Sequence, residues 1–223
     1  ALVRQAGLDI PVIGVIDAGA KGALSVFRPD EDGAIAIFAT VGTVASNGYV
    51  KAIQALRDHL GYSGEIQLFQ QGGYGIAEAV DEEPGFIDYR AETPRRSYRG
   101  PGIGHDQYPI LTELMDAYGF DFSDNRMLCD ARDDGTCSVL QLNSPENYVR
   151  YHLVSLMEQL RKTPGAKPLK ALVLGCTHYP FLTEVIRGTL AELYDFRRDD
   201  AYVYRHLMAP DIRIVDPAMN VAI

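Results

Sequence analysis

The sequence predicts an α/β protein built on a parallel sheet flanked by helices, and two patterns carry this prediction. Short, almost uninterrupted apolar runs recur along the chain, as in parallel strands whose two faces are both covered by helices. Helical patterns alternate with these runs, which is typical of right-handed strand–helix–strand units. The predicted strands are Val12–Ile16, Ile35–Ala39, Ile66–Phe69, Ala171–Leu174 and Ile212–Val215.

The helices between these strands are predicted from capping residues and from the spacing of their apolar positions. Ser46 is the expected N-cap of the first helix, which Gly61 ends, and Ser144-Pro145 starts the second. The positions at helical spacing are Tyr49, Ile53, Leu56 and Leu60, then Val149, Leu153, Leu156, Met157 and Leu160, and finally Leu182, Ile186, Thr189, Leu190 and Leu193.

Residues 72–142 interrupt the alternation, because they are rich in Gly, Pro, Tyr and acidic residues and contain one predicted helix, Tyr108–Tyr118. Connections of this length are usually lids or insertions. An arginine cluster in this segment could contact an anion, although a solvated loop is the simpler interpretation. The cluster consists of Arg90, Arg95, Arg96 and Arg99, interleaved with Tyr89 and Tyr98.

The composition excludes two classes of partner. The 223 residues are 47% hydrophobic and carry a net charge of -9 without a basic run, which argues against nucleic acid and anionic membranes. No apolar stretch approaches the roughly 20 residues that a membrane-spanning helix needs. Three cysteines, Cys129, Cys137 and Cys176, form no C-x-x-C pair, which predicts free thiols in a reducing cytoplasm and no disulfide framework.

The most informative motif is Gly175-Cys176-Thr177-His178-Tyr179-Pro180, which follows a predicted strand and precedes a helix. Ligands of parallel sheets bind beyond the carboxyl ends of the strands. The positive end of the following helix is expected to favour the Cys176 thiolate, and His178 can exchange protons near neutral pH. The pair therefore suits proton transfer or nucleophilic attack, and the alternative is a buried structural cysteine.

A second motif, Thr40-Val41-Gly42-Thr43 followed by Ser46, stands at another junction of strand and helix. Its hydroxyl groups and glycine predict an anion-binding turn, in which Thr40 and Thr43 are the candidate contacts. Simple N-capping is an equal explanation for Ser46. The motif lacks the Gly-Lys-Ser/Thr ending of a nucleotide-binding P-loop.

The hexapeptide 175–180 resembles the C-terminal cysteine motif of bacterial glutamate racemases. The segment from Pro11 to Ala20 and the turn from Ala39 to Ser46 resemble the central part of that family in order and spacing. The resemblance spans Pro11 to about Leu60 and then Ser144 to Asp216. Related aspartate racemases usually carry Glu in place of His178, so this residue points to glutamate.

The resemblance implies a cytoplasmic isomerase that racemises glutamate without metal, pyridoxal or other cofactor and supplies D-glutamate for peptidoglycan, and so for the cell wall and cell shape. Two cysteines act on opposite faces of the α-carbon: one thiolate removes the proton and the other thiol returns one. By position, Cys176 is one of them, His178 assists it, and Thr177, Thr40 and Thr43 bind substrate. Glu78 is a candidate for a family glutamate near the site, with altered flanking residues. A homodimer is compatible with this reading.

The second cysteine of the family belongs to an Ala-Cys-Asn-Thr motif that is absent from this chain. Residues 1–10 are therefore expected to end a helix of a companion N-terminal domain, 11–207 to form the second α/β domain with an insertion at about 72–142, and 208–223 to return to the first domain. The chain alone is expected to be inactive. Two alternatives stay open: a racemase of another acidic amino acid, and a non-catalytic amino-acid-binding or regulatory homologue.

Overall fold

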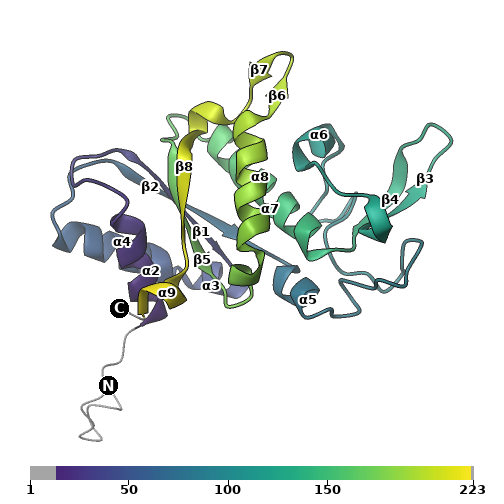
Figure 1. The fold of residues 1–223 in the computed structure, drawn as a ribbon, viewed down its shortest axis with the longest axis horizontal. Helices are drawn as coiled ribbons and strands as arrows, with labels where there is room; N and C mark the ends of the chain where they lie inside the picture. Colours follow the sequence, from purple (N-terminus) through teal and green to yellow (C-terminus); the bar gives the residue numbers. More distant parts are fainter. Residues whose placement is uncertain (1–13, 222–223) are drawn as a thin grey trace, which may run out of the picture.

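A four-stranded parallel sheet forms the centre of the protein (Figure 1). The structure, a computed structural model, describes residues 14–221. The strand order is β2 (Ile66–Gly72), β1 (Gly33–Ala39), β5 (Leu169–Gly175) and β8 (Met208–Val215), and each strand runs parallel to its neighbours. The sheet is flanked by helices, so the predicted fold class is confirmed.

Helices cover both faces of the sheet, which explains why its central strands are continuously apolar. Helices α2 (Val15–Leu24) and α4 (Gly48–His59) pack on one face, and α7 (Pro145–Lys162) and α8 (Thr183–Asp195) pack on the other. All seven residues of β1 are buried. Because successive side chains of a strand point to opposite faces, β1 contributes alternately to the two hydrophobic clusters.

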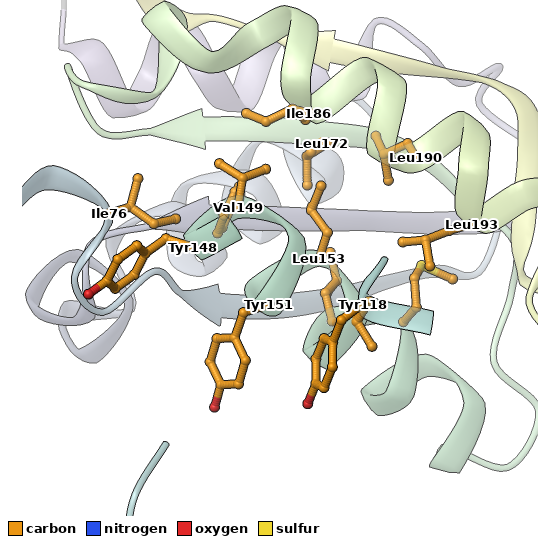
Figure 2. Close-up of a cluster of buried hydrophobic side chains, with 14 of the residues drawn as sticks. Ile76, Tyr118, Tyr148, Val149, Tyr151, Leu153, Leu172, Ile186, Leu190 and Leu193 are labelled. Atoms are coloured by element: carbon orange, nitrogen blue, oxygen red, sulfur yellow. The ribbon is translucent and has the colours of Figure 1, made fainter. Parts of the chain in front are cut away.

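The larger cluster lies between the sheet, α7 and α8, and extends to the residues of the insertion (Figure 2). Helix α7 is buried along most of its length because it lies between the sheet and the insertion. Figure 2 labels Ile76, Tyr118, Tyr148, Val149, Tyr151, Leu153, Leu172, Ile186, Leu190 and Leu193 of this cluster.

The insertion contains only short elements. They are α5 (Ile76–Val80), a 3-10 turn Thr112–Leu114, α6 (Met115–Tyr118), a 3-10 turn Ser123–Asn125, and the antiparallel strands β3 (Met127–Ala131) and β4 (Cys137–Leu142). The predicted helix Tyr108–Tyr118 is therefore wrong in its first half. Ile110 and Leu114 are buried without a continuous helix, since apolar spacing over so few residues does not distinguish a helix from a packed loop.

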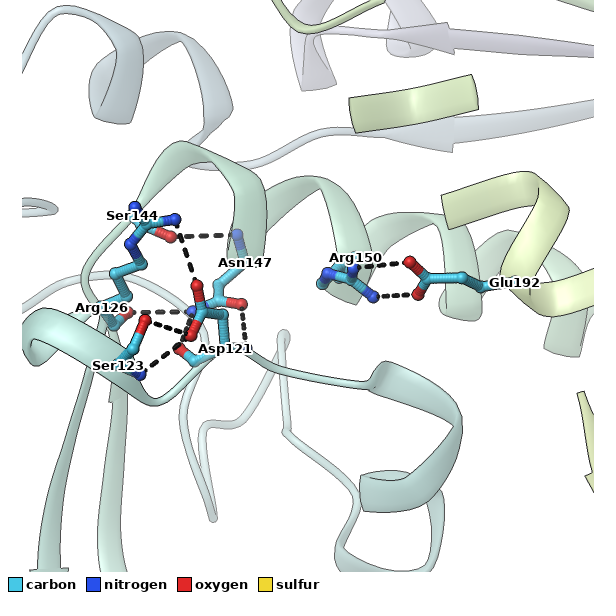
Figure 3. A network of polar contacts seen from close by, with 7 residues as sticks. All are labelled: Asp121, Ser123, Arg126, Ser144, Asn147, Arg150 and Glu192. Carbon is cyan, nitrogen blue, oxygen red and sulfur yellow. Dashed lines mark hydrogen bonds and ion pairs between the residues drawn. The ribbon is translucent and has the colours of Figure 1, made fainter. Parts of the chain in front are cut away.

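Side-chain amides attach the insertion to the start of α7 (Figure 3). The Asn147 amide nitrogen donates to the backbone oxygens of Asp121 and Arg126, and its amide oxygen accepts from the Asp121 nitrogen at 2.9 Å. Asn143 bridges Asp88 and Asn125 in the same manner. The segments around Asp88, Asp121 and Arg126 are thus attached to the start of α7.

Two local predictions are corrected by the structure. Val15 and Ile16, predicted to end a strand, begin helix α2, while Val12, Ile13 and the predicted helix end at 1–10 lie outside the described residues. A short apolar run cannot distinguish a strand from the first turn of a helix. Ser46 ends the short helix α3 (Val41–Ser46) instead of capping the next helix, because Asn47 takes a left-handed conformation before α4.

The cysteines at 129 and 137 form a disulfide bond, so the prediction of free thiols is wrong for this pair. Cys129 lies on β3 and Cys137 on β4 of one antiparallel hairpin, and their Cα atoms lie 5.4 Å apart. The two cysteines are close because their strands pair, and no C-x-x-C motif in the sequence indicates this. Cys176 is the free cysteine.

The remaining elements lie around the end of α8 and after the sheet. They are the 3-10 turns Tyr179–Leu182 and Arg205–Leu207, the two-residue strands β6 (Arg197–Arg198) and β7 (Ala201–Tyr202), and helix α9 (Pro217–Val221). Within the described residues, none of the helices combines the length and apolar character that crossing a membrane requires.

Candidate active site

The two sequence motifs meet at one edge of the sheet. Thr40 follows β1 and Cys176 follows β5, and these strands are neighbours whose last residues, Ala39 and Gly175, pair in register. The parallel arrangement places both strand ends on the same side, as the sequence predicted. Gly175 permits the close approach, since a Cβ atom there would lie 2.7 Å from the Cβ atom of Ala39.

A cavity of about 340 Å³ opens beside these strand ends. Three predicted site residues line it, namely Thr43, Cys176 and Thr177. Tyr49 of α4 and Asp216 at the end of β8 also line it, and the sequence analysis did not select either of them. A second cavity of about 270 Å³ lies between α8 and the start of β8 and contains none of the predicted site residues.

His178 connects Cys176 to a carboxylate. The Cys176 sulfur lies 3.6 Å from Nδ1 of His178, and Nε2 of the same ring lies 3.1 Å and 3.2 Å from the two carboxylate oxygens of Asp81. His178 occupies the N-cap position of the 3-10 turn Tyr179–Leu182, yet its side chain makes no capping hydrogen bond. Its ring is used for the contacts with Cys176 and Asp81.

The Asp81 carboxylate fixes how the histidine can act. A carboxylate accepts hydrogen bonds, so Nε2–H donates to Asp81 and Nδ1 is left facing the thiol of Cys176. The sequence indicated Glu78 of α5, whereas the carboxylate that contacts His178 is that of Asp81, which follows this helix. Asp81 is the C-cap of this short helix and carried no signal of its own, because its proximity to His178 comes from the packing of α5 beside the sheet.

Burial raises the pKa of the Cys176 thiol above its ordinary value, and the charges of Glu78 and Asp81 act in the same direction. Hydrogen bonds from the backbone nitrogens of His178 and Tyr179 lower this pKa without cancelling the rise. The backbone donors at this terminus therefore favour the thiolate, as expected, but at neutral pH burial has the larger effect on the pKa of Cys176. The thiol is protonated there because desolvation outweighs the backbone donors.

We expect this raised pKa to appear in the alkylation of Cys176 by iodoacetamide. Only the thiolate reacts, so the rate should rise with pH and its midpoint should lie above that of a small-molecule thiol measured in parallel. Mass spectrometry of the modified peptide reports the rate, and the Cys176→Ser variant provides the background. A midpoint below that of the free thiol would contradict the assigned environment.

The other predicted residues divide into two groups. Thr40 caps α3: its hydroxyl oxygen accepts from the Thr43 nitrogen at 3.2 Å, and the two threonine hydroxyls lie 2.9 Å apart. Thr40 thus holds Thr43, which lines the cavity. Glu78 lies close enough to Cys176 to influence its pKa, but it does not line the cavity. A substrate contact of Thr40, Thr43, Thr177 or Glu78 stays a prediction.

Comparison with known proteins finds a similar protein for part of the chain. No protein-family model matches. Over 120 residues, the chain is 41% identical to the glutamate racemase of Shouchella clausii (strain KSM-K16), and the alignment covers 51% of this chain and 41% of that protein. The chain therefore spans about two fifths of the length of this curated relative. About half of the chain is thus similar to a glutamate racemase, which supports the family that the cysteine motif indicated.

Proposed function

We propose that the protein racemises glutamate without a cofactor and that Cys176 is one of two cysteines that transfer the α-proton. The contacts from Cys176 through His178 to Asp81, at the sheet edge where both motifs meet, carry this proposal. Similarity to the glutamate racemase of S. clausii supports the choice of substrate. The D-glutamate formed would serve peptidoglycan synthesis.

In this mechanism the three side chains act on one face of the substrate. The Nδ1 atom of His178 accepts the thiol proton, which makes Cys176 the reactive thiolate. The thiolate then removes the α-proton, and in the reverse direction the thiol supplies it. Asp81 stabilises the imidazolium that forms. Thr43 and Thr177 line the same cavity and would hold a carboxylate whose negative charge grows in the transition state.

We further propose that a companion domain covers the cavity and supplies the second cysteine. Val15 lines the cavity and is 55% exposed, while Phe181 and Met219 follow residues that line it and are 81% and 69% exposed. Clustered exposed apolar side chains mark contact surfaces. In the proposed division into domains, 11–207 form one α/β domain. Residues 208–215 were expected to lie in the return segment, and they contribute β8 to the sheet of this domain. Dimerisation stays a prediction.

Proton exchange with solvent tests the proposed function. In deuterium oxide, the full-length protein should incorporate deuterium at the α-carbon of both L- and D-glutamate, as followed by NMR, while chiral chromatography detects the second enantiomer. Residues 1–223 expressed alone should show no turnover, because in this proposal the companion domain supplies the second proton-transfer group.

Three other outcomes would contradict the proposal in different ways. Exchange with aspartate but not glutamate would indicate a racemase of another acidic amino acid. Binding of glutamate without exchange would indicate a binding or regulatory protein. Turnover by residues 1–223 alone would show that no second cysteine from outside this chain is needed.

A further inference from the structure

The cysteine motif contains a buried tyrosine that the proposed mechanism does not use. Tyr179 follows His178 directly and is 0% exposed, and its ring packs against Phe38 of β1 with the ring centroids 4.8 Å apart. Its hydroxyl donates to the backbone oxygen of Gly73 at 3.2 Å. Burial raises the pKa of this hydroxyl well above its ordinary value, so the hydroxyl keeps its proton and acts as the donor. Phenylalanine would fill the same space, so what the hydroxyl adds is this one hydrogen bond.

The acceptor, Gly73, lies between the sheet and the start of α5. Its nitrogen donates to the oxygen of Ala39, the last residue of β1, at 2.8 Å, and its oxygen also accepts from the nitrogen of Ile76, the first residue of α5, at 3.2 Å. The Gly73 oxygen is therefore paired even without the tyrosine. The Tyr179 hydroxyl is thus not needed to satisfy a buried acceptor, and its hydrogen bond attaches the 3-10 turn Tyr179–Leu182 to the beginning of α5.

Helix α5 is held near both of its ends by neighbouring residues of the cysteine motif. Before its start, the Gly73 oxygen accepts from the Tyr179 hydroxyl, and at its end the Asp81 carboxylate lies 3.1 Å from Nε2 of His178. The body of the helix packs against α7. Five helical residues form a stiff connection about 7.5 Å long, so the hydroxyl contact at one end helps to fix where Asp81 lies at the other.

We propose that Tyr179 is a positioning residue whose hydroxyl holds α5 to the turn and thereby keeps the Asp81 carboxylate on Nε2 of His178. This inference rests on the proposed function and adds to it a residue that acts through two others. Asp81 orients the imidazole ring so that Nδ1 faces the Cys176 sulfur. Without the hydroxyl, α5 can shift and the carboxylate can leave the ring. Tyr179 does not line the cavity, so its effect is on the proton transfer and not on substrate binding.

Removal of the hydroxyl alone tests this role. In the full-length protein, Tyr179→Phe should lower kcat about two- to tenfold, as expected for one hydrogen bond, in the direction that His178→Asn affects and with little change in KM. In an Asp81→Asn background the same substitution should cause no further loss, because the carboxylate that it positions is already gone. Gly73→Ala should have the effect of Tyr179→Phe without altering the tyrosine, because a Cβ atom at residue 73 would overlap the hydroxyl.

Tyr151→Phe is the matched control. It also removes the hydroxyl of a buried tyrosine that donates to a backbone oxygen, that of Pro109 at 3.3 Å, but this contact lies between α7 and the insertion. It should leave kcat unchanged in both directions. Equal losses in Tyr151→Phe and Tyr179→Phe, or losses of Tyr179→Phe and Asp81→Asn that add, would make Tyr179 a core residue and overturn the inference. If Tyr179→Phe does not fold, as judged by circular dichroism, Gly73→Ala serves in its place.

The ¹⁵N NMR resonance of Nε2 in His178 tests the same contact without depending on turnover. The resonance is identified by its loss in His178→Asn. At one fixed pH, it should move in Tyr179→Phe toward its position in Asp81→Asn and stay in place in Tyr151→Phe. No movement in folded Tyr179→Phe would overturn the positioning role and leave the racemase proposal intact. The expected movement in a wild-type protein that racemises no glutamate would instead overturn the proposed function, while the link from Tyr179 to Asp81 holds.

Discussion

Replacing Cys176 by serine should reduce glutamate racemisation by the full-length protein by several orders of magnitude in both directions. A serine hydroxyl is far less acidic than a thiol, so it neither becomes the base nor acts as the acid at neutral pH. The substitution removes no large apolar surface, and Cys176 is only partly buried, so the fold should persist. Turnover measured from both enantiomers, with circular dichroism of each variant, gives the result.

The other two cysteines provide the matched control. The double variant Cys129→Ser/Cys137→Ser removes the other two cysteine thiols of the chain, and neither residue lines the cavity. It should keep its turnover provided that it folds. Wild-type kcat in a folded Cys176→Ser variant would make Cys176 a structural residue and would remove the basis of the proposed mechanism.

Replacing His178 by asparagine should lower kcat more than it changes KM, and the loss should be greater in one direction. The imidazole lies 3.6 Å from the Cys176 sulfur, so it assists only the enantiomer whose proton Cys176 handles. General acid–base assistance typically contributes about 10²–10⁴-fold, which sets the expected loss. Initial rates from L- and D-glutamate separate the two directions. Equal losses in both, or a rise in KM alone, would contradict this role.

Asp81 acts through His178, and variants of Asp81 test this in the same measurement of initial rates from L- and D-glutamate. Asp81→Asn should lower kcat in the direction that His178→Asn affects, by a smaller factor, with little change in KM. Asp81→Glu, which keeps the carboxylate, should restore part of the rate. The double variant Asp81→Asn/His178→Asn should be no slower than His178→Asn alone. Additive losses would show that Asp81 does not act through the histidine.

The sequence predicted the fold class, and predicted that two motifs stand at strand ends, because both depend on strong local signals. β1 and β5 are central strands and are apolar on both faces, so their runs are unmistakable in the sequence. Given a parallel sheet, the residues that follow two such strands must emerge on one side. The meeting of the Thr40 and Cys176 motifs therefore required no knowledge of side-chain packing.

The sequence could not predict contacts that arise from long-range packing. Asp81 reaches His178 only through tertiary packing of α5, which contacts α7, and Asp216 reaches the cavity only because β8 pairs with β5. Tyr49 was assigned to the core on its spacing, and it is buried, but its hydroxyl end meets the cavity. The Cys129–Cys137 bond requires the pairing of β3 with β4. Each of these features depends on how two separate segments of the chain pack together, and the sequence of one segment alone does not indicate it.

The pairing of β1 with β5 also determines when during folding the site can exist. These strands are adjacent in the sheet but are separated along the chain by β2, the whole insertion and α7. Contacts between remote segments form late, because the entropy of closing the intervening loop must be lost before they stabilise the chain. Thr43 and Cys176 therefore come together only after most of the chain has folded. An early collapsed intermediate would contain the sequence of both motifs but no functional cavity, and recovery of activity on refolding would follow the slowest structural phase.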